Sequence, residues 1–122
     1  MNNTELGKKG ETVAVEYLKK KGYNILYLNF RYRRLEIDIV AEIHNVLVII
    51  EVKTKSSQNI APPESKVDNK KILNIVNATD KYINKFNVDM PVRFDIITIV
   101  GKIPNIKIEH IENAFRAPLT SY

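Results

Sequence analysis

Two apolar, β-branched segments separated by only two residues constrain this fold more than any other feature of the chain. Residues 36–43 and 46–54 have the composition of β-strands, and His44-Asn45 between them has the length of a tight hairpin turn. If the chain turns there, Ile43 lies opposite Val46, and the residue numbers of every opposed pair sum to 89. A four-residue loop on the same centre keeps this register, whereas a three-residue loop shifts it. The turn needs left-handed backbone, which asparagine adopts more readily than histidine.

Charged residues interrupt both of these otherwise apolar segments. In the predicted register Asp38 faces Glu51, and Glu36 faces Lys53. Directly opposed side chains have Cβ atoms about 5 Å apart, and two carboxylates at that distance repel by roughly 3 kcal/mol. A shared proton, a nearby cation such as Lys53 or a divalent metal would offset this repulsion.

These charges support two interpretations. Two facing carboxylates with a lysine two residues on suit metal-dependent hydrolysis of phosphodiesters: the metal activates a water, and the lysine orients the nucleophile or stabilises the transition state. The alternative is a Glu36–Lys53 cross-strand salt bridge, with Asp38 and Glu51 solvated at a sheet edge. The residues alone leave both interpretations open.

The remaining periodicity predicts one domain spanning residues 1–122. We expect an α/β fold in which a mixed β-sheet of about five strands is flanked by helices, in the order αβββαββ. A helix between the third and fourth strands makes those two strands parallel. The other expected elements are a helix that Thr4 caps and Gly22 ends, a strand at residues 23–31, a loop at 56–65, a helix at 67–87, and strands at 92–100 and 106–111.

Composition restricts the chemistry that is available to the chain. There is no cysteine, so thiolate metal sites are excluded, and oxygen ligands favour Mg²⁺ or Mn²⁺. The chain has a net charge of +5, and its basic excess lies in residues 1–85, which is compatible with a polyanionic partner. No export signal or membrane-spanning run is present, so we expect a cytoplasmic protein without a membrane partner.

Motifs spread along nearly the full length resemble those of a known group of proteins. As an ordered set they are similar to the PD-(D/E)xK, or restriction-endonuclease-like, nuclease superfamily, and most closely to the bacterial YraN family. The motifs are Gly7-x-x-Gly10-Glu11, Tyr17-Leu18, Gly22-Tyr23, Asn29-x-Arg31, Glu36-Ile37-Asp38, Glu51-Val52-Lys53-Thr54, Arg93-Phe94-Asp95 and Asn113-Ala114-Phe115. Leu35 departs from the family pattern, which has glycine there.

The resemblance implies a restriction-endonuclease-like fold and a role for each matching residue. Asp38 and Glu51 would bind the metal, the Val52 carbonyl would add a ligand, and Lys53 would assist catalysis. Glu11 matches a first-helix glutamate that related Holliday-junction resolvases use near the metal. Its alternative role is a carboxylate on the flank of the helix, bonded to a basic neighbour.

Basic residues flank the predicted site, and any one of them could instead be a solvated surface charge. The candidates for phosphate contacts are Arg31, Arg33, Arg34, Lys55 and Lys71. Tyr32 could stack on a base or pack at an edge. We expect an internal Arg93–Asp95 salt bridge, and we assign no chemistry to the two histidines.

Three functions therefore remain in play. The first is a Mg²⁺- or Mn²⁺-dependent nuclease acting on DNA, with branched or single-stranded substrates suggested by the resolvase resemblance. Resolvase-like chemistry needs two active sites and is thus compatible with a homodimer. The second is a non-catalytic nucleic-acid-binding module of the same fold. The third is a protein-interaction domain unrelated to nucleic acid, which would not bind DNA even at low salt.

Overall fold

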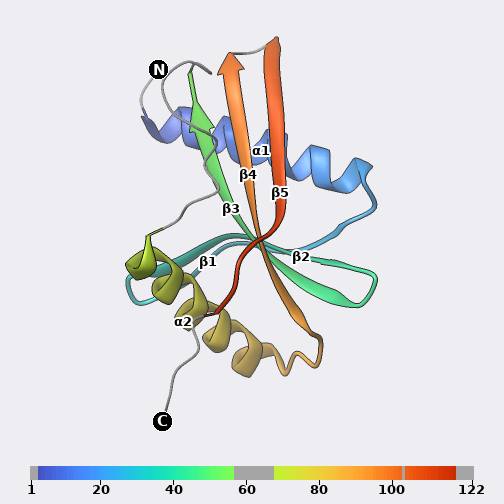
Figure 1. The fold of residues 1–122 in the computed structure, drawn as a ribbon, viewed down its shortest axis with the longest axis vertical. Helices are drawn as coiled ribbons and strands as arrows, with labels where there is room; N and C mark the ends of the chain where they lie inside the picture. Colours follow the sequence, from blue (N-terminus) through green and yellow to red (C-terminus); the bar gives the residue numbers. More distant parts are fainter. Residues whose placement is uncertain (1–2, 57–67, 103, 118–122) are drawn as a thin grey trace.

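The computed structural model describes residues 3–56, 68–102 and 104–117, and Figure 1 shows their arrangement. The elements follow the predicted order αβββαββ. They are α1 (Asn3–Lys20), β1 (Asn24–Tyr32), β2 (Leu35–Ile43), β3 (Val46–Lys55), α2 (Asn69–Phe86), β4 (Val92–Lys102) and β5 (Asn105–Phe115). The last two strands are longer than the sequence pattern suggested. Most of the expected loop at 56–65 lies outside the described residues.

The five strands form one mixed sheet in the order β1-β2-β3-β4-β5. β3 and β4 are parallel, as predicted, and the other neighbouring strands are antiparallel. In Figure 1 the ribbons of β1 and β2 run at a steep angle to those of β4 and β5, so the sheet is strongly twisted. β3 lies at the centre of the sheet, and its side chains can reach both faces.

Each face of the sheet has its own apolar core. Ala14 and Leu18 of α1 pack with Ile50 of β3 and Ile97 of β4 in one cluster. The other cluster contains residues of α2 together with Val40 and Ile49 from the central strands, as well as Phe30 of β1. The two helices therefore cover opposite faces (Figure 1). On β3, this alternation directs odd-numbered side chains to the α2 face and even-numbered ones to the α1 face.

Local capping fixes the ends of α2. The Asp68 carboxylate accepts a hydrogen bond from the Lys71 backbone N–H at 2.8 Å, and Asn87 ends the helix in the left-handed conformation at φ 53°. The first helix begins at Asn3, one residue before the position where we expected the cap, Thr4. Within the described ranges, no helix is long and apolar enough to cross a membrane.

A close approach between α1 and the end of β3 occurs at Gly10. A Cβ at this buried position would overlap the Cγ2 methyl group of Thr54. Gly10→Ala is therefore expected to lower the free energy of unfolding by about 1–3 kcal/mol, although alanine in an unobstructed helix would gain about 1 kcal/mol. Urea-induced unfolding measures this change.

Thr54→Ser is the matched background for this substitution because it removes the obstructing methyl group. In that background we expect Gly10→Ala to cost less than about half as much. An unchanged cost would show that the overlap with Thr54 does not determine the need for glycine.

Candidate functional site

The predicted register of the central hairpin is confirmed up to the point where its ladder ends. The pairs Ile43–Val46, Val40–Ile49 and Ile39–Ile50 all follow the predicted sum, and His44 and Asn45 both have positive φ, at 50° and 63°. Histidine thus adopts the left-handed turn conformation that we expected it to resist.

Beyond the pair of Ile39 and Ile50, main-chain pairing between β2 and β3 ends, and the Asp38 side chain bonds to the β3 backbone in its place. The next positions are Asp38 and Glu51, which are not part of the ladder. Instead, the Val52 backbone N–H donates a hydrogen bond to Asp38 Oδ2 at 2.8 Å. The two carboxylates therefore stand where the paired part of the β2–β3 ladder ends.

The Asp38 carboxylate is in an unfavourable environment for its charge. Burial is the largest cause that raises its pKa, and the nearby Glu51 carboxylate is the second. The hydrogen bond from Val52 N–H lowers the pKa only in part, so that it rises from 3.8 to about 7. A cation placed between the two acids would stabilise both carboxylates in their charged form, and it would therefore lower the pKa of Asp38.

Lys71 already supplies one cation to the pair. Its Nζ lies 2.9 Å from Glu51 Oε1, and the Glu51 side chain is only 10% exposed. The hydrogen bond to Glu51 is the main cause that raises the pKa of Lys71. The Asp68 cap sets the first turn of α2, and this turn places Lys71 against the carboxylate. Lys71, which the sequence suggested as a phosphate contact, is thus in direct contact with a predicted metal ligand.

Glu11 approaches the same region from α1. Its Oε1 accepts a hydrogen bond from Asn29 Nδ2 at 2.7 Å. Burial is the largest cause that raises the pKa of Glu11, and the charge of Glu36 adds to it, while the Asn29 bond acts in the opposite direction. Glu11 in turn contributes to the raised pKa of Asp38. Its hydrogen-bond partner is therefore an amide, where sequence reasoning offered a basic neighbour as the alternative to a metal.

Asn29 is a site residue to which sequence reasoning gave no role. It occupies β1 with φ 53°, between the register pairs Leu28–Ile39 and Phe30–Ile37, and hence beside Asp38. The detectable signal was an asparagine in an apolar strand, because asparagine tolerates left-handed backbone.

The outer charges of the hairpin are arranged differently from the prediction. Glu36 is the register partner of Arg31 in β1, and the two side chains form a salt bridge of 3.5 Å. The predicted opposition of Glu36 to Lys53 lies beyond the end of the β2–β3 ladder. Lys53 is half-buried, two residues past Glu51, and strand alternation puts both on the same face.

The acidic side chains do not form a ready-made three-carboxylate metal site. In the described ranges, no three histidine or acidic residues are grouped closely enough to hold an ion. Glu11 is held by Asn29, and Glu51 by Lys71. Asp38 and Glu51 nevertheless offer the hard oxygen donors that Mg²⁺ uses, and this ion commonly takes only one or two carboxylates and keeps several waters. The donor chemistry therefore fits Mg²⁺ or Mn²⁺, with Asp38 and Glu51 as the central pair.

The other predicted basic residues fall into two groups. Arg33 and Arg34 lie at the β1–β2 turn beside Tyr32, whose ring has the Arg33 guanidinium 5.4 Å and the Lys81 ammonium 5.0 Å from its centroid. Lys55 lies at the end of β3. In the sequence, basic residues thus precede Asp38 at the β1–β2 turn and follow Glu51 at the end of β3.

A second polar cluster lies on the α1 face. Asp95 is fully buried and receives hydrogen bonds from Arg93 Nε and Nη2 at 2.9 Å, which confirms the predicted internal salt bridge. His110 Nε2 lies 2.8 Å from Asp95 Oδ2, and His110 Nδ1 lies 3.1 Å from the Tyr17 hydroxyl. These contacts satisfy the buried carboxylate, and they give His110 a structural role that the sequence did not reveal.

Comparisons with known proteins agree with the motif pattern. Residues 10–99 match the profile of the Uncharacterised protein family UPF0102. A UPF0102 protein of Phocaeicola vulgatus is 50% identical over 117 residues, covering 96% of this chain and 97% of the relative. UPF0102 proteins of Christiangramia forsetii and Flavobacterium johnsoniae are 47% and 43% identical, and each match covers 93% of this chain and 95% of the relative. The chain therefore belongs to the UPF0102 family, the YraN-like family that its motifs indicated.

Proposed function

We propose that this protein is a Mg²⁺- or Mn²⁺-dependent nuclease that hydrolyses phosphodiester bonds in DNA. The observation that carries the proposal is the pair of neighbouring carboxylates at the end of the β2–β3 ladder, the partly buried Asp38 and the buried Glu51, which raises the pKa of Asp38 far above its ordinary value. Two carboxylates this close repel each other and destabilise the protein, and such arrangements are characteristic of functional sites that need concentrated negative charge. Binding a divalent cation is such a function.

The proposed roles follow from the position of each residue. Asp38, Glu51 and the Val52 carbonyl would hold the ion, which supplies Lewis acidity toward the phosphate and toward water when it is bound. The Val52 N–H holds the Asp38 carboxylate in place. Lys53, on the same strand face as Glu51, would orient the attacking water or stabilise charge on the phosphate. Lys71 forms an ion pair with Glu51 and would be available to a phosphate where a metal takes that role.

The same ion pair favours a second candidate function. Because Lys71 already occupies one oxygen of Glu51 and the three acids do not converge, the fold could bind nucleic acid without cleaving it. Such a module would show salt-sensitive binding and no cleavage with any divalent ion. The two functions thus differ in whether the protein cleaves DNA when a divalent ion is present.

The decisive test is a cleavage assay on a panel of end-labelled DNA: linear duplex, single strand and four-way junction, each with Mg²⁺, Mn²⁺ or chelator. We expect metal-dependent cleavage of at least one substrate, and a loss of at least about 100-fold in Asp38→Asn and in Glu51→Gln, which corresponds to roughly 3 kcal/mol of transition-state stabilisation. Glu16→Gln makes the same chemical change at an exposed position of α1 and should cleave at the wild-type rate. Equal activity of the two site variants and the wild type would refute the nuclease proposal.

We propose a homodimer only for cleavage of substrates in which two strands must be cut together, because each strand then needs its own active site. Light scattering on the protein with and without the four-way junction measures the stoichiometry. Two protein chains per junction are expected if both strands are cleaved.

A further inference from the structure

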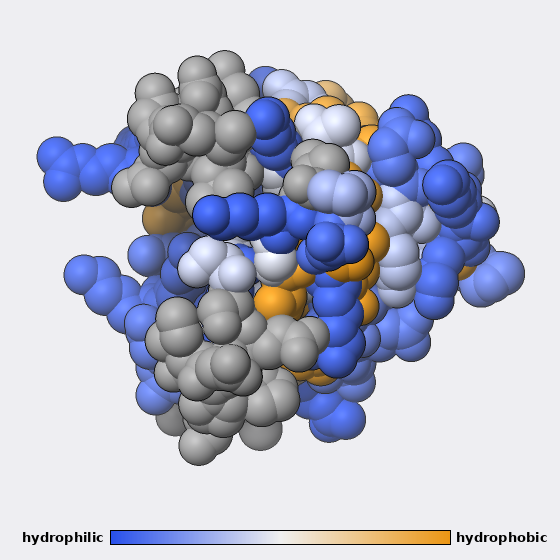
Figure 2. Space-filling view, turned by 90° about the horizontal axis from the view of Figure 1, so that it is seen from above, coloured by the Kyte–Doolittle hydropathy of each residue, from blue (hydrophilic) through white to orange (hydrophobic). Residues whose placement is uncertain are grey.

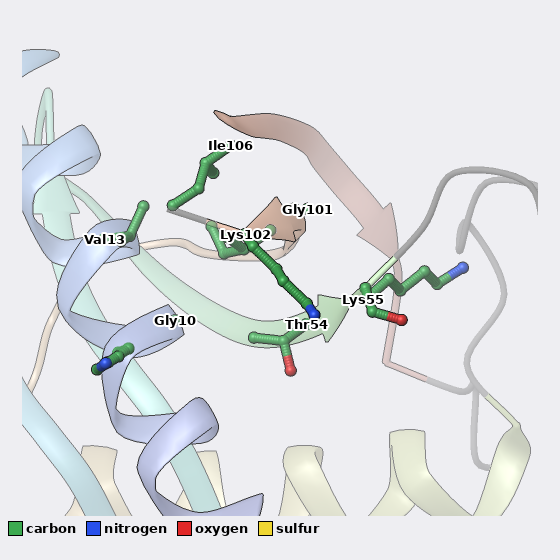
Figure 3. Close-up of a pocket in the computed structure, with 10 residues that line it drawn as sticks. Gly10, Val13, Thr54, Lys55, Gly101, Lys102 and Ile106 are labelled. Carbon is green, nitrogen blue, oxygen red and sulfur yellow. The ribbon is translucent and has the colours of Figure 1, made fainter. Parts of the chain in front are cut away.

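A cavity of about 530 Å³ opens at the end of β3, on the face of the sheet that α1 covers. It lies between the first half of α1, the end of β3, and the end of the β4–β5 hairpin (Figure 3). Its volume is within the range of pockets that hold small organic groups. The lining residues are Lys9, Gly10, Val13, Thr54, Lys55, Ser56, Ile99, Gly101, Lys102 and Ile106.

The cavity combines an apolar interior with a basic rim. Val13 and Ile106 point toward each other across it, and Lys102 extends over the opening toward Thr54, whereas Lys55 points outward (Figure 3). Of the lining residues that the structure describes, three are lysines and none is acidic, so this part of the lining favours an anion. In Figure 2, which looks onto this end of the molecule, hydrophobic surface is visible between hydrophilic groups. The occupant that fits should carry a flat or compact apolar body and negative charge beside it.

The cavity and the metal site share two structural elements at consecutive positions. Gly10, which lines the cavity, precedes Glu11 on α1, and Thr54 follows Lys53 on β3. Because β3 side chains alternate, Lys53 and Glu51 face α2, while Thr54 faces α1 and the cavity. A polymer bound across the end of β3 could thus occupy both sites at once.

We propose that this cavity holds an unpaired nucleotide of the DNA substrate, next to the bond that is cleaved. The inference rests on the proposed nuclease function and names its substrate class: DNA with a single-stranded segment at the site of cleavage. The base fills the apolar interior, and the flanking phosphates lie against Lys102 and Lys9, both of which are exposed. A base that is stacked and paired in a duplex is not free to enter such a pocket, whereas an unpaired base is.

The lining predicts low sequence preference for this nucleotide. Among the described lining residues, the side-chain polar groups are the hydroxyls of Thr54 and Ser56 and the lysine ammonium groups, without an amide or carboxylate to distinguish base edges. The pocket would therefore recognise the single-stranded state of the DNA with little regard to its sequence.

The test is fluorescence anisotropy without metal, using a labelled 12-nucleotide single strand and a blunt 12-base-pair duplex as probes. Val13→Phe fills the cavity without changing charge, and we expect it to weaken binding of the single strand at least tenfold while duplex binding changes less than twofold. Lys102→Gln is the second variant, because an exposed rim residue can be changed without disturbing the core. It should reduce the salt dependence of single-strand binding by about 0.7 in logarithmic slope. Lys20→Gln, an exposed lysine at the other end of α1, removes the same charge and should leave single-strand affinity near the wild-type value.

The outcomes separate this inference from the nuclease proposal. Asp38→Asn should lose cleavage but keep the preference of the wild type for the single strand over the duplex, since the cavity does not include Asp38. Equal losses for single strand and duplex in Val13→Phe, or equal effects of Lys102→Gln and Lys20→Gln, would overturn the cavity assignment even if the protein cleaves DNA. Self-association that Val13→Phe abolishes, with no change in DNA binding, would assign the cavity to a second copy of the chain and would also overturn it. Selective single-strand binding in a protein that never cleaves would uphold the pocket and refute the nuclease.

Discussion

Asparagine in place of Asp38 is expected to stabilise the metal-free protein by about 2–4 kcal/mol at pH 8, while it removes the proposed metal binding. Burial and the Glu51 carboxylate raise the pKa of Asp38 to about 7 in the folded state. The unfolded chain releases this proton near pH 4. Stability of the wild type therefore falls as the pH rises from about 4 to about 7, and Asp38→Asn lacks this loss.

Chemical unfolding of both proteins between pH 4 and pH 8, in the presence of chelator, measures this difference. The gain should be largest at pH 8 and should vanish near pH 4, where Asp38 of the folded wild type is protonated. Asparagine keeps an oxygen that can accept the hydrogen bond from the Val52 N–H, so the substitution removes charge more than it removes packing. A variant less stable than the wild type at pH 8 would mean that the negative charge of Asp38 is not a source of strain.

Addition of divalent metal should reverse the order of the two proteins. A ligand at 1,000 times its dissociation constant stabilises the folded state by about 4.1 kcal/mol, which exceeds the expected difference. We expect Mg²⁺ or Mn²⁺ to raise the unfolding midpoint of the wild type and to leave that of Asp38→Asn unchanged. Equal shifts in both would place the bound metal elsewhere.

Loss of the Asp95 carboxylate is expected to have an effect of similar size and opposite sign. Asp95 is fully buried and accepts hydrogen bonds from Arg93, from the Asn113 N–H and at His110. Asp95→Ala removes the buried carboxylate that the Arg93 guanidinium and His110 Nε2 contact. Breaking such a pair costs about 3–5 kcal/mol, so we expect the variant to unfold at much lower urea concentration or to fail to fold.

Glu112→Gln is the control because it removes a carboxylate from the same cluster at its exposed edge. Glu112 lies 3.8 Å from Arg93 Nη2 and its side chain is 61% exposed, so its loss should cost less than about 1 kcal/mol. Similar costs for the two substitutions would show that the cluster is not held together by Asp95.

The contribution of Asp95 to the free energy of unfolding also depends on pH, and it changes with pH in the opposite direction to that of Asp38. Burial alone would raise the pKa of Asp95, but the hydrogen bonds from His110, Arg93 and the Asn113 N–H outweigh it and hold the pKa below its ordinary value. The stabilisation is therefore present above the unfolded pKa of about 4 and is lost as the pH falls through the lower folded value.

The sequence predicted the central hairpin well because few alternatives satisfy its pattern. Two β-branched segments separated by His44-Asn45 leave one register that buries both, and the structure has that register from Ile43–Val46 to Ile39–Ile50. The parallel pairing of β3 and β4 followed similarly from the helix between them. Period and chain length determine these features, and both can be read from the sequence.

The contacts of the site could not be predicted in the same way. The pairing of Lys71 with Glu51 depends on how α2 docks on the sheet, and the bond between Glu11 and Asn29 depends on the packing of α1 beside β1. His110 meets Asp95 only because β5 returns next to β4. Such contacts join residues distant in sequence, and no periodicity encodes them.

The two-residue turn at His44 and Asn45 also limits how this protein can change. Side chains on β3 alternate between the face with Glu51 and Lys53 and the face with Thr54. One inserted residue would shift β3 against β2 and exchange the two faces, which would carry the acids into the α1 core and Thr54 away from its cavity. Substitutions that keep positive φ are therefore tolerable at these two positions, whereas a single-residue insertion or deletion would remove both proposed sites together.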